Sequence, residues 1–323
     1  MKENNVDLSK GDVSLDTIKL MYEQAFKISS DGIEVRKLHG GVESVVYLII
    51  DNSEKNVLKL APLDFNKTIS VDKNTFWWEI KMLSFMEKIN FPSPRVLYYD
   101  NYLEICPVPY FFMSYIKGEN YNDVKSTLSK SEIKSIEFQI GVLCKKISNC
   151  ISQNFFLPSF PNKKFANNLE FVSFLFELLF LDAKNCDLNL LEIKEKIHQI
   201  LAKYRESLNN ITKLCLNHTD IWDGNILIDR GKITGIVDFS DLYFCDELMT
   251  FYFHTIDGII SEDFLNGYGK KHLTYDEKIR IQIYRIYVLL KMIVECKLKN
   301  YGKFDWMYDS ISTNLALLLK KER

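Results

Sequence analysis

The chain has 323 residues, with 41 Lys and Arg against 43 Asp and Glu, so its formal net charge is −2 at pH 7. This length allows two lobes with a large buried core, and the near-neutral charge argues against nucleic acid as the main partner. The seven cysteines lack metal-binding spacing, and no apolar stretch suggests a membrane span or a secretion signal, so a reduced cytoplasmic protein is expected.

The first part of the chain predicts a helix followed by a small antiparallel sheet. Ser14 can cap a helix that has Ile18 and Met21 on one face. Residues 37–60 then contain two β-rich runs, and the polar triplet at 51–53 joins them as a turn.

Lys59 is an isolated charge in the second of these runs. A charged side chain on a buried strand requires an anionic partner. The helix predicted at 77–89 supplies Glu79 as the best candidate partner and Glu87 as a lesser one. The alternative is a lysine that extends from the strand to solvent. The apolar stripe of this helix consists of Trp78, Met82 and Phe85 or Met86.

Further elements follow in order along the chain. A proline-marked FPSP run introduces another strand, and residues 110–118 predict the last strand of the sheet. Ser129 and Glu132 fit a capping box for a helix that extends to Ile147. The remaining predicted helices cover residues 169–181, 190–208, 284–298 and 305–320.

The segment 214–239, LCLNHTDIWDGNILIDRGKITGIVDF, carries the strongest functional signal. Its three apolar runs predict a strand, a loop and a hairpin, with Asp220 and Asn225 on the loop and Asp238 brought alongside them at the end of the hairpin. One carboxylate can orient a hydroxyl, while an amide and a carboxylate suit Mg²⁺. Singly, such residues are ordinary turn formers, but together and in this order they predict phosphoryl transfer.

This segment resembles the signature of the small-molecule kinases related to aminoglycoside phosphotransferases and choline kinases. That signature is His-Gly-Asp, then Asn-Ile-Leu, then Ile-Asp-Phe or Ile-Asp-Trp. The chain reads His218-Thr219-Asp220, Asn225-Ile226-Leu227 and Val237-Asp238-Phe239. It departs from the family at Thr219, where glycine is usual, and further on, where only Asp246 matches a Gly-Asp-Pro motif. The resemblance extends over about residues 30–310.

The resemblance implies an α+β fold of the bilobal protein-kinase type. Residues 1–115 would form the nucleotide-binding small lobe, with an antiparallel sheet and one main helix, and residues 116–323 a mostly helical large lobe. It also implies ATP or GTP as phosphate donor and Mg²⁺ as cofactor, with Asp220 as catalytic residue and Asn225 and Asp238 as metal ligands. The implied nucleotide-binding residues are Gly40, Gly41, Ser44, Lys59, Glu79, Met113, Ser114 and Ile116.

The implied reaction is phosphorylation of a hydroxyl on a small molecule. The sequence Asp-Phe-Ser-Asp at 238–241 is closer to the pattern of antibiotic kinases than to that of choline kinases, so an aminoglycoside-type acceptor and a role in antibiotic resistance are expected. Candidate acceptor-binding residues are Asp241, Asp257, Glu262 and Trp306.

Other interpretations stay open. The acceptor could be choline, a sugar, homoserine or a macrolide, with Trp306, Tyr301 and Tyr308 able to form an aromatic cage for a quaternary ammonium. A non-catalytic binding or coat protein with the same fold is a second alternative. A protein kinase is disfavoured because no Ala-Pro-Glu segment follows residue 238. A monomer is expected, with a dimer as the alternative, and neither nucleic acid nor a membrane is expected as a partner.

Overall fold

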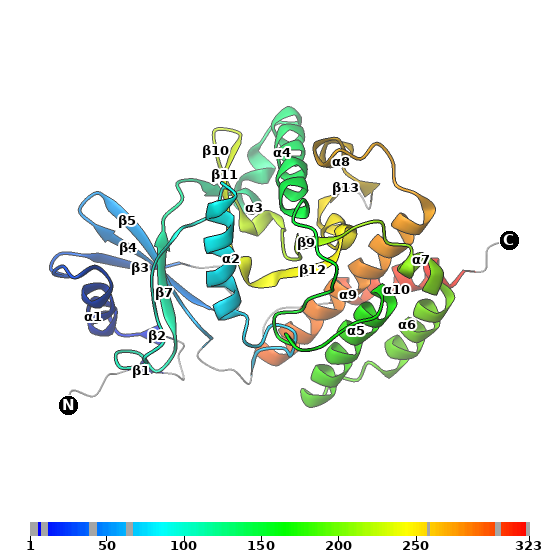
Figure 1. Ribbon diagram of the computed structural model, residues 1–323, viewed down its shortest axis with the longest axis horizontal. Helices are drawn as coiled ribbons and strands as arrows, with labels where there is room; N and C mark the ends of the chain where they lie inside the picture. Colours follow the sequence, from blue (N-terminus) through cyan, green and yellow to red (C-terminus); the bar gives the residue numbers. More distant parts are fainter. Residues whose placement is uncertain are drawn as a thin grey trace.

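The computed structural model describes residues 6–7, 12–38, 44–62, 67–256, 259–300 and 305–320. Its N-terminal part is an antiparallel sheet with helices and its C-terminal part is mostly helical, which confirms the predicted fold class (Figure 1). The division between residues 115 and 116 stays a prediction; the last strand of the sheet ends at Ser114. Within the described part of the chain, no helix is long and apolar enough to cross a membrane.

Most strands precede the long run of α-helices from α3 to α7, and a second group of short strands separates this run from the last three α-helices. The helices are α1 (Leu15–Phe26), α2 (Phe76–Lys88), α3 (Tyr121–Val124), α4 (Lys130–Ser148), α5 (Asn168–Asn185), α6 (Leu191–Lys203), α7 (Arg205–Asn209), α8 (Glu262–Tyr268), α9 (Tyr275–Lys299) and α10 (Asp305–Leu319). The strands are β1 (Val6–Asp7), β2 (Asp12–Val13), β3 (Glu34–Lys37), β4 (Val45–Asp51), β5 (Glu54–Leu60), β6 (Val96–Asp100), β7 (Tyr110–Ser114), β8 (Glu119–Asn120), β9 (Leu214–His218), β10 (Ile226–Asp229), β11 (Lys232–Ile236), β12 (Leu242–Asp246), β13 (Thr255–Ile256) and β14 (Ile259–Ile260).

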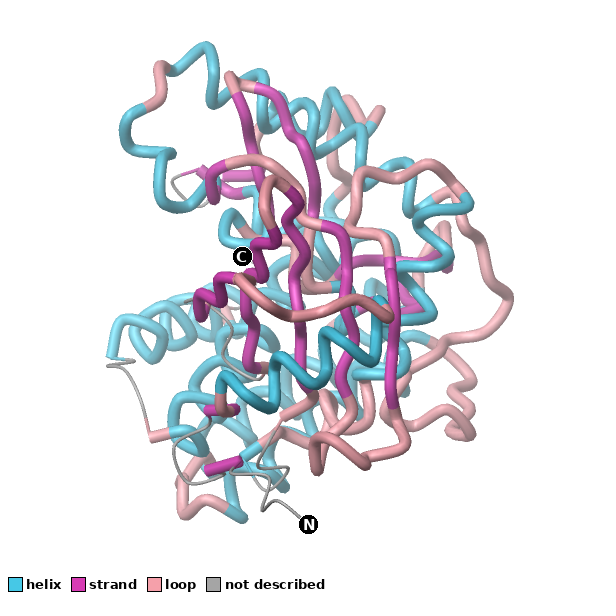
Figure 2. Tube along the Cα trace, turned by 90° about the vertical axis from the view of Figure 1, so that its left-hand side faces the viewer, coloured by secondary structure: helices cyan, strands magenta, loops and turns pink. Residues whose placement is uncertain are grey.

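The small lobe is built on a five-stranded antiparallel sheet with the order β3-β4-β5-β7-β6. Figure 2 shows these strands side by side. Side chains alternate along β7, so Phe111 and Phe112 point to opposite faces. The Phe111 ring contacts Phe76 of α2, whereas the Phe112 ring contacts Tyr22 and Phe26 of α1. The two helices therefore cover opposite faces of the sheet, with α2 on the side of the large lobe (Figure 1).

The helix starts follow the capping rules that the sequence suggests. Ser14 accepts a hydrogen bond from the first turn of α1, and Ser129 with Glu132 forms the predicted capping box of α4. The helix predicted at 284–298 begins earlier than expected, because Thr274 supplies a second capping box at the start of α9.

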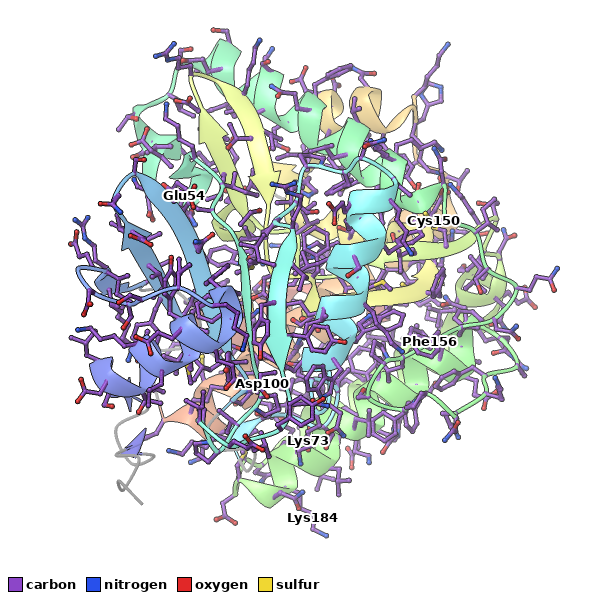
Figure 3. The ribbon with its side chains drawn as sticks, turned by 60° about the vertical axis from the view of Figure 1, so that its left-hand side comes forward. Glu54, Lys73, Asp100, Cys150, Phe156 and Lys184 are labelled. Carbon is purple, nitrogen blue, oxygen red and sulfur yellow. The ribbon has the colours of Figure 1, made fainter. Side chains whose placement is uncertain are left out.

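The buried face of α2 differs from the predicted apolar stripe. The buried residues are Phe76, Glu79, Ile80, Leu83 and Met86. Met86, the alternative to Phe85 in the predicted stripe, is among these buried residues, whereas Trp78, Met82 and Phe85 are only partly buried. Trp78 instead faces the large lobe, where its indole N–H donates to the Leu242 carbonyl at 2.8 Å and its ring lies 4.9 Å from that of Phe156. In Figure 3, α2 stands between the strands of the small lobe and the chain around Phe156.

The large lobe carries the signature segment on two short antiparallel pairs. Strand β9 pairs with β12, while β10 pairs with β11 on one side and with β8 on the other. The predicted hairpin is confirmed, and its turn uses Arg230 (φ 50°) and Gly231 (φ 74°), the left-handed backbone that two-residue hairpin turns favour. Strand β12 was not expected. It places residues 242–246 beside β9, the strand that leads into the loop of Asp220 and Asn225.

Candidate active site

Lys59 joins the two lobes through ion pairs with two acids. Its Nζ lies 2.7 Å from Glu79 Oε2 on α2 and 3.1 Å from Asp238 Oδ1 after β11. The side chains of Lys59 and Glu79 are 8% and 2% exposed, so their charges are compensated inside the protein. Glu79 was the preferred partner for Lys59, and the structure forms this pair. Helix α2 also packs against the short helical turn of residues 239–241, which directly follows Asp238.

The loop of residues 219–225, between β9 and β10, is the candidate catalytic loop, and hydrogen bonds among the signature residues hold it in place. The backbone N–H of Asp220 donates to His218 Nδ1 at 3.3 Å, so Nε2 carries the proton and donates to the Val237 carbonyl at 3.3 Å. Burial lowers the pKa of His218, which keeps the ring neutral. His218 thus supports the loop and the end of the hairpin together, and its geometry is that of an orienting residue.

Asn225 connects the loop to the candidate metal site. Its Nδ2 donates to the backbone carbonyl of Asp220 at 2.7 Å and to Asp220 Oδ2 at 2.9 Å. The Asn225 carbonyl accepts from the Val237 N–H at 3.0 Å, which brings residue 225 beside Asp238 as predicted from the hairpin. Within the described chain, Asn225 Oδ1 accepts no hydrogen bond and so is available to a ligand.

Asp238 has the accessibility that a metal ligand requires. Its side chain is 41% exposed, and Lys59 and Ser240 both bind Oδ1, which leaves Oδ2 for a cation. The backbone has φ 63° and ψ 74°, a left-handed conformation that Asp tolerates better than most residues. An amide oxygen and a carboxylate on adjacent segments are ligands of the kind that Mg²⁺ binds, so the residues present fit this ion.

The two carboxylates of the site have pKa values shifted in opposite directions. Burial, and then the nearby Asp241, raise the pKa of Asp220 well above its usual range, against the opposing charge of Lys291. Partial burial also works to raise the pKa of Asp238, but Lys59 and the Ser240 hydroxyl outweigh this and lower it. Asp238 is therefore suited to facing a cation and Asp220 to accepting a proton, the separation of roles typical of acid and base pairs.

The predicted hinge residues lie at the end of β7. Met113 is buried, whereas Ser114 is bound to Arg95: its N–H donates to the Arg95 carbonyl at 2.8 Å and its hydroxyl accepts from the Arg95 N–H at 2.9 Å. The Ser114 N–H is therefore not available to a nucleobase. In the part of the chain that the structure describes, the Ile116 N–H has no hydrogen-bond partner. Ser44 directly precedes β4, whose first residue pairs with Leu60, so it lies at the same end of the sheet as Lys59.

The candidate acceptor residues are not gathered in one place. The prediction that Asp241 contacts the acceptor is corrected, because its carboxylate is buried and both of its oxygens already have partners. Oδ1 accepts from the Tyr243 hydroxyl and Oδ2 from Lys291, each at 2.9 Å. Glu262 is exposed in the first turn of α8, and Trp306, 56% exposed, lies in the first turn of α10. Four predicted site residues lie outside the described residues, namely Gly40, Gly41, Asp257 and, from the alternative aromatic cage, Tyr301.

Three residues of the site were not predicted from the sequence. Lys291 on α9 and Asp72 before α2 form an ion pair of 2.9 Å beside Asp241. Trp222, two residues after Asp220, is 41% exposed, and its ring lies against Gly224, where an added Cβ would be only 2.2 Å from ring atoms. Two features of the sequence could have pointed to these residues. Lys291 interrupts an otherwise apolar run in α9, and Trp222 is an aromatic residue inside the candidate catalytic loop.

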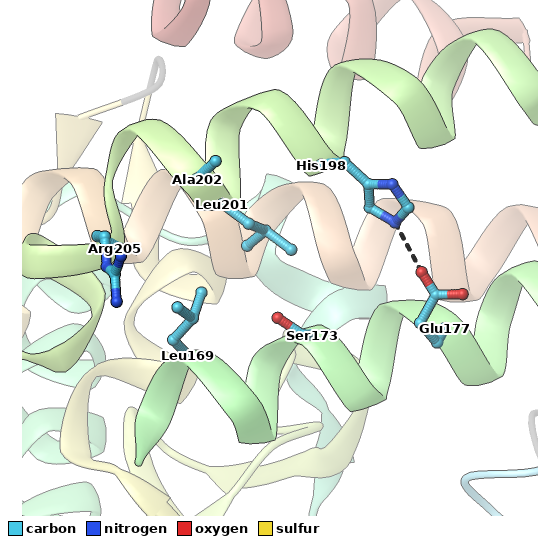
Figure 4. A pocket seen from close by; sticks show the side chains of 7 residues that line it. All are labelled: Leu169, Ser173, Glu177, His198, Leu201, Ala202 and Arg205. Atoms are coloured by element: carbon cyan, nitrogen blue, oxygen red, sulfur yellow. Dashed lines mark hydrogen bonds and ion pairs between the residues drawn. The ribbon is translucent and has the colours of Figure 1, made fainter.

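A separate groove of about 460 Å³ lies between α5 and α6. Figure 4 shows Leu169 and Ser173 of α5 opposite Leu201 of α6, with His198 and Glu177 joined at one end, where His198 Nε2 lies 2.7 Å from Glu177 Oε1. The two helices correspond to the segments predicted at 169–181 and 190–208. None of the residues that line the groove belongs to the catalytic loop or the lysine site.

The fold and the site define a bilobal, kinase-like phosphotransferase. The chain belongs to the phosphotransferase enzyme family named APH, whose family model matches residues 34–274. It is an enzyme of the small-molecule kinase class, as the sequence predicted. A comparison with curated proteins gives no match.

Solved structures of this class resemble the chain over nearly its full length. A protein from Haemophilus somnus 129PT that is assigned as a fructosamine-3-kinase has 16% identity to this chain and a TM-score of 0.70, with 94% of this chain and 97% of that chain covered. APH(2")-IIa, in a ternary complex with streptomycin and ATP, has 20% identity and a TM-score of 0.61, with 96% and 98% covered. A thermostable mutant of APH(4)-Ia with AMP-PNP and hygromycin B has 14% identity and a TM-score of 0.63, with 94% and 96% covered. At these identities the likeness is one of fold.

Proposed function

We propose that this phosphotransferase moves the γ-phosphoryl group of ATP or GTP to a hydroxyl of a small molecule, with an aminoglycoside-type amino sugar as the favoured acceptor. The proposal rests on the hydrogen bonding of the Asp220 carboxylate. Among the described residues, only Asn225 binds its carboxylate, through Oδ2, so Oδ1 remains as an acceptor beside the Lys59, Asn225 and Asp238 groups. A cytoplasmic, monomeric enzyme is part of this proposal.

In the proposed reaction, Asp220 Oδ1 accepts a hydrogen bond from the acceptor hydroxyl and takes its proton late in transfer. A bond forms between the acceptor oxygen and the γ-phosphorus while the bond to the β,γ-bridging oxygen breaks, and ADP or GDP leaves. Lys59, held by Glu79, stabilises the α- and β-phosphates. Asn225 Oδ1 and Asp238 are the residues that would hold Mg²⁺, which supplies positive charge to the phosphate oxygens. Most of the rate then comes from positioning and charge stabilisation.

The hinge contributes the nucleobase contacts in this proposal. Since the Ser114 N–H is occupied by Arg95, the proposed main-chain contacts are the Ser114 carbonyl and the Ile116 N–H, with Met113 against the base. The N–H groups of Gly40 and Gly41, together with Ser44, complete the proposed phosphate site. The choice between ATP and GTP is part of the test below.

The acidic surroundings of Asp220 support a cationic acceptor. Asp241, Asp238 and Glu295 act to raise its pKa and Lys291 acts to lower it, so acids outnumber the cation around this carboxylate, which favours an approaching ammonium group. Two of the similar structures hold aminoglycosides, and another is assigned as a fructosamine-3-kinase. A sugar amine of the fructosamine type is therefore the second candidate acceptor. Glu262 and Trp306 remain proposed acceptor contacts.

Mass spectrometry of acceptors after incubation with the protein, Mg²⁺ and either ATP or GTP tests this function. The panel contains aminoglycosides, a fructosamine, macrolides, choline, homoserine and simple sugars, with Asp220→Asn as the control. We expect a phosphate adduct on an amino sugar that the control does not form. An adduct only on choline, homoserine or a simple sugar would refute the amino-sugar substrate class, and no adduct with any acceptor would favour a non-catalytic binding role.

A further inference from the structure

Lys291, on α9, pairs with acids from two distant parts of the chain. Its Nζ lies 2.9 Å from Asp72 Oδ1 and 2.9 Å from Asp241 Oδ2. The side chain of Lys291 is 13% exposed, and those of the two acids are 5% and 10% exposed. Glu295, one turn further along the helix, lies 3.9 Å away. One buried cation therefore holds together carboxylates that would repel each other without it.

Asp241 connects Lys291 to the catalytic loop. Its backbone carbonyl accepts two hydrogen bonds from Thr219, from the N–H at 2.8 Å and from the hydroxyl at 2.9 Å. Thr219 directly precedes Asp220. The Asp241 side chain is fixed between Lys291 and the Tyr243 hydroxyl, so the position of its carbonyl, and hence of Thr219, depends on both contacts.

Asp72 connects Lys291 to the small lobe. The Asp72 carbonyl accepts a hydrogen bond of 2.8 Å from the hydroxyl of Thr75, the residue before the first turn of α2. Nearby, the Ser70 N–H and hydroxyl donate to the two carboxylate oxygens of Asp182 on α5, at 2.7 and 2.6 Å. The segment that leads into α2, the helix of Glu79, is thus attached to α9 and to α5.

We propose that Lys291 is a positioning residue for phosphoryl transfer, which fixes the Thr219-Asp220 backbone relative to α2 through simultaneous ion pairs with Asp241 and Asp72. This inference rests on the proposed function. Within the described residues, Lys291 makes no hydrogen bond or ion pair with Glu79, Asn225 or Asp238. Its loss should therefore lower kcat and leave the affinity for magnesium nucleotide unchanged.

The test compares Lys291→Met with Lys291→Arg, using Lys297→Met as a matched control. Lys297 is an exposed lysine on the same helix. The readouts are kcat on the acceptor found in the panel, nucleotide Kd by calorimetry, and amide hydrogen exchange of the peptide 214–222. We expect Lys291→Met to lower kcat about 100-fold, because small displacements of a catalytic group are this costly, and to speed exchange in that peptide. Lys291→Arg should recover most of the rate, and the control should match the wild type.

A second variant tests the inference if Lys291→Met does not fold. The triple variant Asp72→Asn, Lys291→Met, Asp241→Asn removes the lysine together with the charges of its two closest acidic partners, and it should show the same loss of kcat with unchanged nucleotide Kd. Wild-type kcat and exchange in the folded variants would overturn the inference. An equal loss of nucleotide binding would also overturn it, because general destabilisation would then explain the result. Absence of transfer by the wild type would refute the proposed function itself, and the exchange data would then decide separately whether Lys291 positions the loop.

Discussion

Replacement of Arg280 by Met should cause a large loss of stability. Arg280 is 1% exposed, and its Nε donates to Asp246 Oδ2 at 2.7 Å. Its Nη1 donates to the carbonyls of Ser207 and Asn210, at 3.0 and 2.8 Å. These bonds supply donors to carbonyl groups at the C-terminal end of α7 that have no partner within the helix. The variant roughly keeps the length of the side chain but leaves the fully buried carboxylate of Asp246 with the Tyr284 hydroxyl, at 2.7 Å, as its remaining donor among the described residues.

The expected magnitude follows from the cost of breaking a buried ion pair, which is about 3–5 kcal/mol when one partner is removed. For a chain of this size, about 2 °C of Tm per kcal/mol gives a decrease of about 6–10 °C. Arg285→Met is the control, since Arg285 lies on the same helix and makes no ion pair with any described residue. Thermal unfolding followed by circular dichroism measures both variants. A decrease within about 2 °C of the control would refute the reasoning, since it would correspond to only ~1 kcal/mol.

The pH dependence of the same variant provides a second check. Burial raises the pKa of Asp246 even with Arg280 in place. A carboxyl group with a folded-state pKa above its unfolded value favours folding at low pH, and this contribution is lost as the pH rises through the folded-state pKa. Without Arg280 the pKa rises further, so the stability deficit of Arg280→Met should be larger at pH 8 than at pH 5. Equal deficits in urea unfolding at the two pH values would contradict this explanation.

The other predictions concern the nucleotide site and the helix packing. Lys59→Met should lower kcat/KM for the nucleotide about 100-fold or more, because a preorganised charge on the phosphates is lost; steady-state kinetics with unchanged constants would exclude this role. Asp238→Asn should raise the Mg²⁺ concentration needed for half-maximal rate, and an unchanged Mg²⁺ titration would show that another residue binds the ion. Gly141→Ala should destabilise the protein by about 1–3 kcal/mol, because its Cβ would lie 2.2 Å from the Phe264 carbonyl oxygen of α8; urea unfolding should show no such loss for the exposed Lys134→Ala on the same helix.

The sequence predicted the parts of the fold that local rules determine. The caps at Ser14 and Ser129 fix helix starts through hydrogen bonds between near neighbours, and the hairpin turn at 230–231 needs only its own residues. The signature residues came together as expected, because the hairpin brings Asp238 back beside Asn225. In these cases, each interaction spans a short stretch of chain.

Errors arose where a distant partner decides the environment of a residue. The apolar stripe of α2 was misplaced because Glu79, which pairs with Lys59 as predicted, lies on the buried face of the helix, and an apolar pattern does not reveal a face that includes a charged residue. Asp241 looked like a free acid on a loop, but Lys291, 50 residues away, pairs with it. A contact of this kind depends on how α9 packs beside residue 241, and the periodicity of a single segment carries no information about that packing.

The most direct test of the proposed catalytic role of Asp220 is the single-turnover rate of phosphate transfer by wild type and Asp220→Asn, with nucleotide binding measured on the same samples. We expect the variant to bind magnesium nucleotide with wild-type affinity and to transfer phosphate about 10²–10⁴-fold more slowly, the usual contribution of a positioned general base. Transfer at the wild-type rate by Asp220→Asn would contradict the assignment of Asp220 and, with it, the proposed mechanism.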